Sequence, residues 1–157
     1  MLCPLKLLSL NLDAELKFYK ERGATGGTVC TVTLSQSESF HYRWGKNNMG
    51  DSDSGSGWSH GTCENDDIAS MIICNARKGL ALTVFDDGSL THKGDDYATV
   101  LVKTNMKDCL TIRKFESSET YKNEYNGDEV EVRYKKDDNL DWRISSMEIH
   151  FEGIISS

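Results

Sequence analysis

The sequence has a single proline, at position 4, and no apolar run near the roughly 18 residues that a membrane-spanning helix needs. Lys and Arg number 18 against 25 Asp and Glu, so we do not expect the basic surface of a nucleic-acid-binding protein. No serine lies in a nucleophile-elbow motif and no histidine lies in a recognisable catalytic frame, which argues against an enzyme. A body free of proline is compatible with uninterrupted strands.

The composition is that of a globular chain with an acidic surface. The 157 residues are 38% hydrophobic and 9% aromatic, which is enough for one domain with its own core. The formal net charge is −7 and the pI is about 5.1. Paired acidic residues recur along the chain, and such pairs suit cation binding and plain solubility equally well.

Short segments in which β-branched and aromatic residues alternate with polar ones predict an all-β fold. The expected strands cover residues 15–19, 28–34, 40–44, 68–74, 80–85, 97–102, 129–134 and 144–151. Glycines at 23, 26 and 27 predict a hairpin between the first two strands. The polar tract 51–57 predicts a surface loop, whereas 110–125 reads as a loop or the start of a short helix. Eight strands in two sets of four predict a pair of Greek keys packed as a β-sandwich with inserted loops.

The first ten residues are apolar, but Lys6 interrupts them and no small-residue cleavage site follows. We therefore expect an arm that packs on the domain, on a protein partner or on a second copy, and not a signal peptide. The expected divisions are an arm over residues 1–13, a body over 14–152 with halves 14–76 and 77–152, and a tail over 153–157.

The five cysteines leave two interpretations open. Cys3 lies in the arm, and the four in the body are Cys30, Cys63, Cys74 and Cys109. These four can pair in three ways, or they can be reduced thiols buried in the core. We favour an extracellular over a cytoplasmic location.

A short acidic pattern occurs twice. Residues 66–71 read DDIASM and residues 141–146 read DWRISS, and each copy is followed by a strand-like run. A duplicated unit indicates a duplicated architecture. Carboxylates, hydroxyls and carbonyls in a turn are the oxygen ligands that calcium prefers.

These features resemble the βγ-crystallin family. Its unit opens with an aromatic residue followed at a fixed offset by a glycine, and Tyr19 with Gly26 keeps that spacing. In the second half Phe85 stands at the aromatic position. Its calcium motif is two Asn/Asp residues, two variable residues, then Ser/Thr and Ser. The matching residues are Asp66, Asp67 and Ser70 in the first copy and Asp141, Ser145 and Ser146 in the second. Met71 and Trp142 depart from the motif.

The resemblance implies cross-paired calcium sites, each with ligands from both copies. The implied ligands are the carbonyls of Lys20, Ile68, Asp86 and Arg143, the hydroxyls of Ser70 and Ser145, and carboxylates from Asp67 and Asp141. Because Trp142 has no side-chain oxygen, the site that uses Asp67 is the stronger of the two. The alternative is that these serines only satisfy backbone groups at the turns.

The resemblance implies a non-enzymatic, calcium-binding structural or extracellular binding module. One alternative is a protease inhibitor or toxin that acts through an inserted loop such as 46–62. Another is an oligomeric adhesion or pore-associated subunit that uses the arm. Trp58, in the inserted loop, is expected either to touch a partner or to fold back onto the sandwich.

Overall fold

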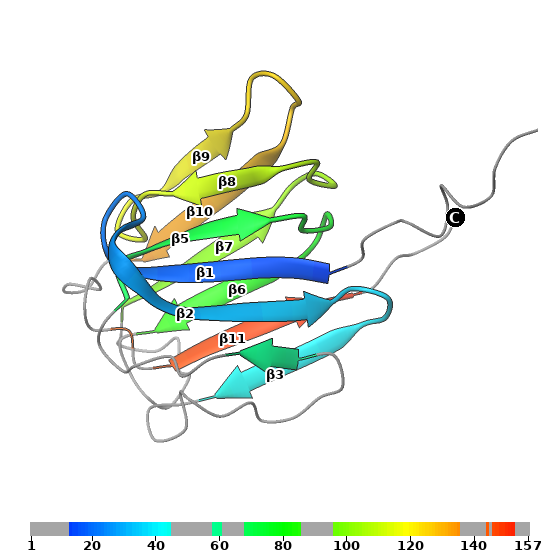
Figure 1. The fold of residues 1–157 in the computed structure, drawn as a ribbon, viewed down its shortest axis with the longest axis horizontal. Coiled ribbons are helices and arrows are strands. Elements are labelled where there is room, and N and C mark those ends of the chain that lie inside the picture. Colours follow the sequence, from blue (N-terminus) through cyan, green and yellow to red (C-terminus); the bar gives the residue numbers. More distant parts are fainter. Residues whose placement is uncertain are drawn as a thin grey trace, which may run out of the picture.

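The computed structural model describes residues 13–44, 58–60, 68–85, 96–135, 144 and 146–152. The expected arm (except Asp13), the tail and the polar tract 51–57 lie outside these residues. The described part contains no helix and forms two antiparallel sheets stacked as a β-sandwich (Figure 1). The all-β prediction is confirmed.

The first sheet has five strands in the order β4-β2-β1-β5-β8. They are β1 (Asp13–Glu21), β2 (Thr25–Ser35), β4 (Trp58–His60), β5 (Ser70–Cys74) and β8 (Cys109–Ile112). The second sheet has six strands in the order β3-β11-β6-β7-β10-β9. They are β3 (Phe40–Trp44), β6 (Ala81–Phe85), β7 (Tyr97–Val102), β9 (Glu119–Lys122), β10 (Glu129–Lys135) and β11 (Ser146–Phe151).

Each half of the chain contributes one strand to the sheet of the other half. β3 pairs with β11 in the second sheet, and β8 pairs with β5 in the first. Among the other strands, β2-β1-β5 are consecutive in the first sheet and β7-β6-β11 are consecutive in the second. Both trios therefore have the same order, and each carries a strand of the other half at the same edge. The Greek-key organisation of the two halves stays a prediction.

The core lies between the sheets because strand residues alternate between the two faces. In β1, Ala14, Leu16 and Phe18 are fully buried while the residues between them are partly exposed. The largest fully buried side chains come from both sheets and their connections: Phe18, Phe85, Phe115, Phe151, Leu16, Leu34, Ile68, Met71, Ile73, Leu80 and Leu82. Burial of each stabilises the fold by about 1.5–3 kcal/mol relative to exposure.

The segment 110–125, expected to be a loop or a short helix, contains most of β8 and all of β9. These strands lie at sheet edges and bury little: only Ile112 is buried in β8 and only Tyr121 in β9. A strand with one buried residue has no period-2 pattern to detect. β4 pairs with β2 at the other edge of the first sheet.

Candidate functional site

The two described residues before β5 lie against the end of β1. Tyr19 and Ser70 are directly opposite each other in the β1–β5 pair. The amide of Ala69 donates a hydrogen bond to the carbonyl of Tyr19 at 2.9 Å. The described end of the first acidic copy and the predicted aromatic position therefore meet at one end of the sandwich.

Ser70 links the start of β5 to the β1–β2 hairpin. Its side chain is fully buried, and its Oγ donates to the carbonyl of Glu21 and accepts from the amide of Ala24 at 2.9 Å. Buried hydroxyls require such partners. Of the two roles that the sequence left open for Ser70, these contacts favour the one in which it satisfies backbone groups.

Three of the predicted calcium ligands, Lys20, Ile68 and Ser70, lie in the described part, and the structure brings them together. Lys20 follows Tyr19 in β1 with an exposed side chain, and Ile68 precedes Ala69 with a fully buried side chain. Because the Ile68 side chain is in the core, only its backbone is a candidate ligand. The other predicted ligands lie outside the described residues: Asp67, Asp86, Asp141, Arg143 and Ser145.

The second copy repeats the pairing of the first. Ser146 lies opposite Phe85 in the β11–β6 pair, as Ser70 lies opposite Tyr19. Strand register therefore aligns Ser70 with Ser146. The sequence motif aligns Ser70 with Ser145, which is one residue earlier. The side chains that follow each serine agree with this: Met71 and Met147 are both fully buried.

The β1–β2 hairpin needs glycine for steric reasons. Gly26 has φ = 78°, and a Cβ there would lie 2.6 Å from Cγ of Glu21. Ala24, two residues earlier, has φ = 59° although it carries a Cβ. Left-handed backbone favours glycine because an L side chain crowds the following carbonyl. The glycine-rich hairpin predicted between the first two strands is confirmed.

Trp58, the predicted partner-binding residue, begins β4, and its backbone lies opposite Leu34 of β2. The described backbone of the inserted loop is therefore part of the first sheet. Its side chain and the rest of residues 46–62, apart from β4, lie outside the description, so the partner role of Trp58 stays a prediction.

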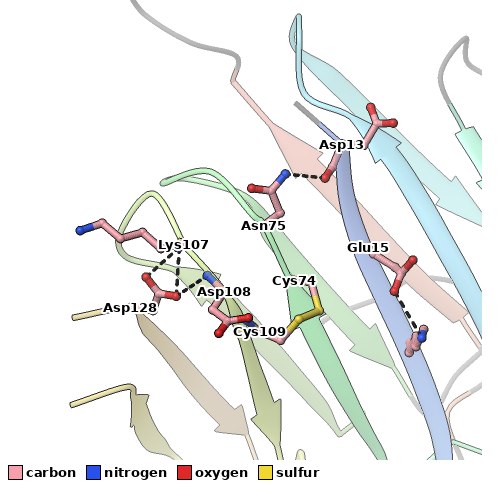
Figure 2. The surroundings of a disulfide bond; sticks show 9 residues. Asp13, Glu15, Cys74, Asn75, Lys107, Asp108, Cys109 and Asp128 are labelled. Carbon is pink, nitrogen blue, oxygen red and sulfur yellow. Dashed lines mark hydrogen bonds and ion pairs between the residues drawn. A yellow bond between two sulfur atoms is a disulfide. The ribbon is translucent and has the colours of Figure 1, made fainter. Parts of the chain in front are cut away.

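Figure 2 shows a disulfide between Cys74 in β5 and Cys109 in β8, which are directly opposite each other in the β5–β8 pair. Cys30 in β2 is disulfide-bonded as well. For these three cysteines the structure favours disulfides over reduced core thiols. The pair joins the two halves of the chain at the exchanged strand β8.

Asp128 is a buried carboxylate that the sequence reasoning missed. It accepts hydrogen bonds from the amides of Lys107 at 2.9 and 3.0 Å and of Asp108 at 2.9 Å (Figure 2). It therefore fastens the loop before β8 to the turn before β10. The signal was the Asn126-Gly127-Asp128 turn, because aspartate in turns commonly accepts from nearby amides.

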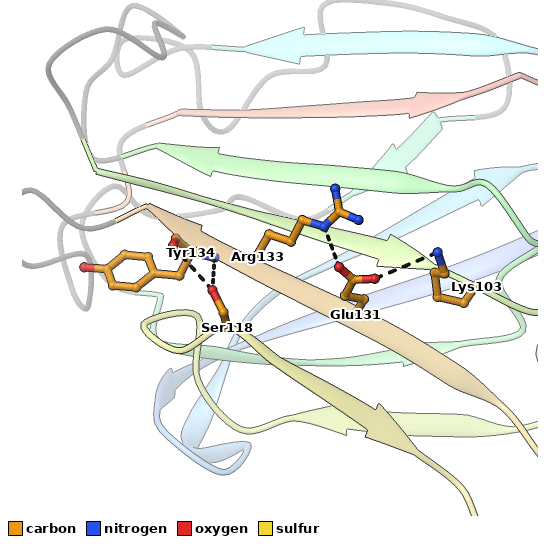
Figure 3. Close-up of polar contacts among 5 residues, drawn as sticks. All are labelled: Lys103, Ser118, Glu131, Arg133 and Tyr134. Atoms are coloured by element: carbon orange, nitrogen blue, oxygen red, sulfur yellow. Dashed lines mark hydrogen bonds and ion pairs between the residues drawn. The ribbon is translucent and has the colours of Figure 1, made fainter.

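The outer face of β10 carries an ion-pair network. Glu131 accepts a hydrogen bond from Nε of Arg133 and lies 3.8 Å from Nζ of Lys103 (Figure 3). The Arg133 hydrogen bond is the main reason that the pKa of the Glu131 carboxyl is held below its usual value. Burial, with the nearby Glu119 charge, raises the pKa of the Tyr121 hydroxyl.

Two further observations concern the part of the chain that the structure describes. It has no group of three or more His, Cys, Asp or Glu side chains arranged to hold a metal ion. It has no helix long and apolar enough to cross a membrane.

Comparison of the chain with protein-family models, curated proteins and solved structures finds no match.

Proposed function

We propose that this protein is a non-enzymatic structural or binding module of an extracellular compartment, stabilised by calcium at its two acidic turns. The proposed ligands are the carboxylates of Asp67 and Asp141, the hydroxyl of Ser145 and the backbone carbonyls that the resemblance implies. The hydroxyl of Ser70 is left out because it already bridges backbone groups of the hairpin. Its function is to present a stable β-sandwich surface to a partner.

The observation that supports the proposal is a shared strand register. Ser70 lies opposite Tyr19 and Ser146 lies opposite Phe85, so the described ends of the two copies pair with their neighbouring strands in the same way. The matching order of the two strand trios adds to this support. A duplicated unit with the same strand register in both copies is compatible with two equivalent oxygen-rich sites.

The disulfides support the extracellular part of the proposal. Cys74–Cys109 is a structural cross-link between neighbouring strands, and Cys30 is also bonded. Such bonds persist in oxidising compartments and are rare where thiols are kept reduced.

The test is thermal unfolding of chelator-treated protein with and without millimolar calcium. Calcium that binds only the folded state should raise the midpoint by about 5–10 °C at a hundredfold excess over Kd. Asp67→Ala and Ser145→Ala should each remove most of this rise. Matched controls are Glu124→Ala and Ser118→Ala, which change exposed residues far from the motifs in sequence and should leave it intact.

If calcium does not change the unfolding midpoint of the wild-type protein, the calcium part of the proposal is wrong, whereas the β-sandwich fold is unaffected. A rise that survives in both Asp67→Ala and Ser145→Ala would place the ion elsewhere.

A further inference from the structure

Two histidines face each other on the outer surface of the second sheet. His41 in β3 and His150 in β11 are directly opposite in the antiparallel pair, and their ring centroids lie 5.4 Å apart. Their side chains are 49% and 44% exposed, whereas Ile149 and Phe151 beside His150 are buried. The rings therefore point to solvent, away from the core.

Each ring contacts its own glutamate. Nε2 of His41 contacts Oε1 of Glu148, and Nε2 of His150 lies 3.1 Å from Oε1 of Glu152. In the neutral tautomer that donates Nε2–H to a carboxylate, the Nδ1 atom carries the lone pair that a metal ion requires. A carboxylate that orients an imidazole in this way is the usual second partner of a metal-binding histidine.

The two rings border a shallow hollow of about 290 Å³, and the residues of β6 that line it have small side chains. Ala81 and Thr83 of β6 line it together with Glu148 and the two histidines. Small residues beside the histidine pair leave room above the sheet for an ion and its bound water.

We propose that His41 and His150 form a two-ligand site for a divalent transition-metal ion, Zn²⁺ or Cu²⁺. With metal–nitrogen distances of about 2.0–2.1 Å and about 1.2 Å from nitrogen to ring centre, a tetrahedral ion separates two ring centroids by roughly 5.2 Å. The centroid separation of 5.4 Å in the structure matches this value. Imidazole nitrogen suits zinc and copper, whereas calcium takes oxygen ligands, so this site is separate from the proposed calcium turns.

The site has two protein ligands, and water completes the coordination, since no third His, Cys, Asp or Glu of the described residues is grouped with them for metal binding. An open site of this kind binds an exchangeable ion. Because His41 is in the exchanged strand β3 and His150 is in β11, the ion would fasten one half of the chain to the other.

The first experiment is calorimetric titration of the metal-free wild-type protein with Zn²⁺. We expect one zinc ion per chain, and at least about a tenfold loss of affinity in each of His41→Ala and His150→Ala. His92→Ala, which removes a histidine outside this pair, is the matched control and should bind as the wild type does. Equal affinity in wild type and both variants, or no binding by the wild type at 100-fold molar excess of zinc, would overturn the proposal.

A second measurement uses only the wild-type protein, so a variant that fails to fold does not weaken the test. Electron paramagnetic resonance of the Cu²⁺-loaded chain should contain the coupling of two imidazole nitrogens, and a spectrum without nitrogen coupling would overturn the assignment. Millimolar calcium should leave zinc affinity unchanged. Displacement of zinc by calcium would place zinc in the oxygen-rich turns and contradict the histidine site. If the protein binds zinc through His41 and His150 but does not respond to calcium, only the calcium proposal fails.

Discussion

At the scale of single residues, Ser70 is the side chain whose contacts determine the clearest prediction. Its buried hydroxyl bridges the carbonyl of Glu21 and the amide of Ala24. Ser70→Ala leaves both groups without this partner, and we expect the free energy of unfolding to fall by about 1–2 kcal/mol. Denaturant unfolding monitored by tryptophan fluorescence measures the change. Because the hydroxyl is already used by the hairpin, the calcium-dependent rise in midpoint should persist.

Ser118 is a matched control for Ser70. Its hydroxyl accepts from the amide of Tyr134 at 2.9 Å and donates to the Tyr134 carbonyl at 3.4 Å, but its side chain is exposed (Figure 3). Water replaces such contacts, so Ser118→Ala should cost less than about 0.5 kcal/mol. Equal losses in the two variants would mean that burial of Ser70 adds nothing. Loss of the calcium response in Ser70→Ala would return this serine to the ligand set.

At the scale of secondary-structure elements, the Cys74–Cys109 disulfide holds the exchanged strand β8 against β5. The bond joins residues 35 positions apart, and a cross-link of that span restricts the unfolded chain. We expect Cys74→Ser/Cys109→Ser to lower the free energy of unfolding by about 2–4 kcal/mol, as measured by denaturant titration. A loss below about 0.5 kcal/mol would show that backbone pairing alone holds β8 in place.

The elements also show why some features are readable from the sequence and others are not. β1, β2, β7 and β10 alternate buried and partly exposed residues over most of their length, and this period identifies a half-buried strand without further information. β8 and β9 bury one residue each, so the sequence contains almost no signal for them. These two strands form because each pairs with a neighbour at the edge of a sheet, and that pairing is defined only once the sheet is assembled.

Pairings across the sheet are the second kind of feature that the sequence hides. The partner of Cys74 depends on the β5–β8 register, and the proximity of His41 to His150 depends on the β3–β11 register. The motif aligns Ser70 with Ser145 because it counts from the first aspartate of each copy, whereas strand register aligns Ser70 with Ser146. Aligning the buried methionines, Met71 and Met147, would have placed Ser70 with Ser146.

At the scale of the whole molecule, strand exchange makes each half depend on the other. Residues 14–76 contain β3, whose described pairing partner is β11, and residues 77–152 contain β8, whose described pairing partner is β5. The strands that remain in each half form a sheet with one apolar face, which nothing covers until the other sheet packs there. An uncovered apolar face loses the hydrophobic stabilisation that packing of the two sheets supplies.

We therefore expect each half, expressed alone with Cys74 or Cys109 changed to serine, to lack a cooperative unfolding transition. Mixing the two halves should restore the β-sheet circular dichroism spectrum in a 1:1 complex, because the core between the sheets forms only when both are present. Sedimentation of the mixture gives the stoichiometry. A half that unfolds cooperatively by itself would show that each half is an independent folding unit to which β3 or β8 is an addition. Each acidic turn would then be formed in its isolated half.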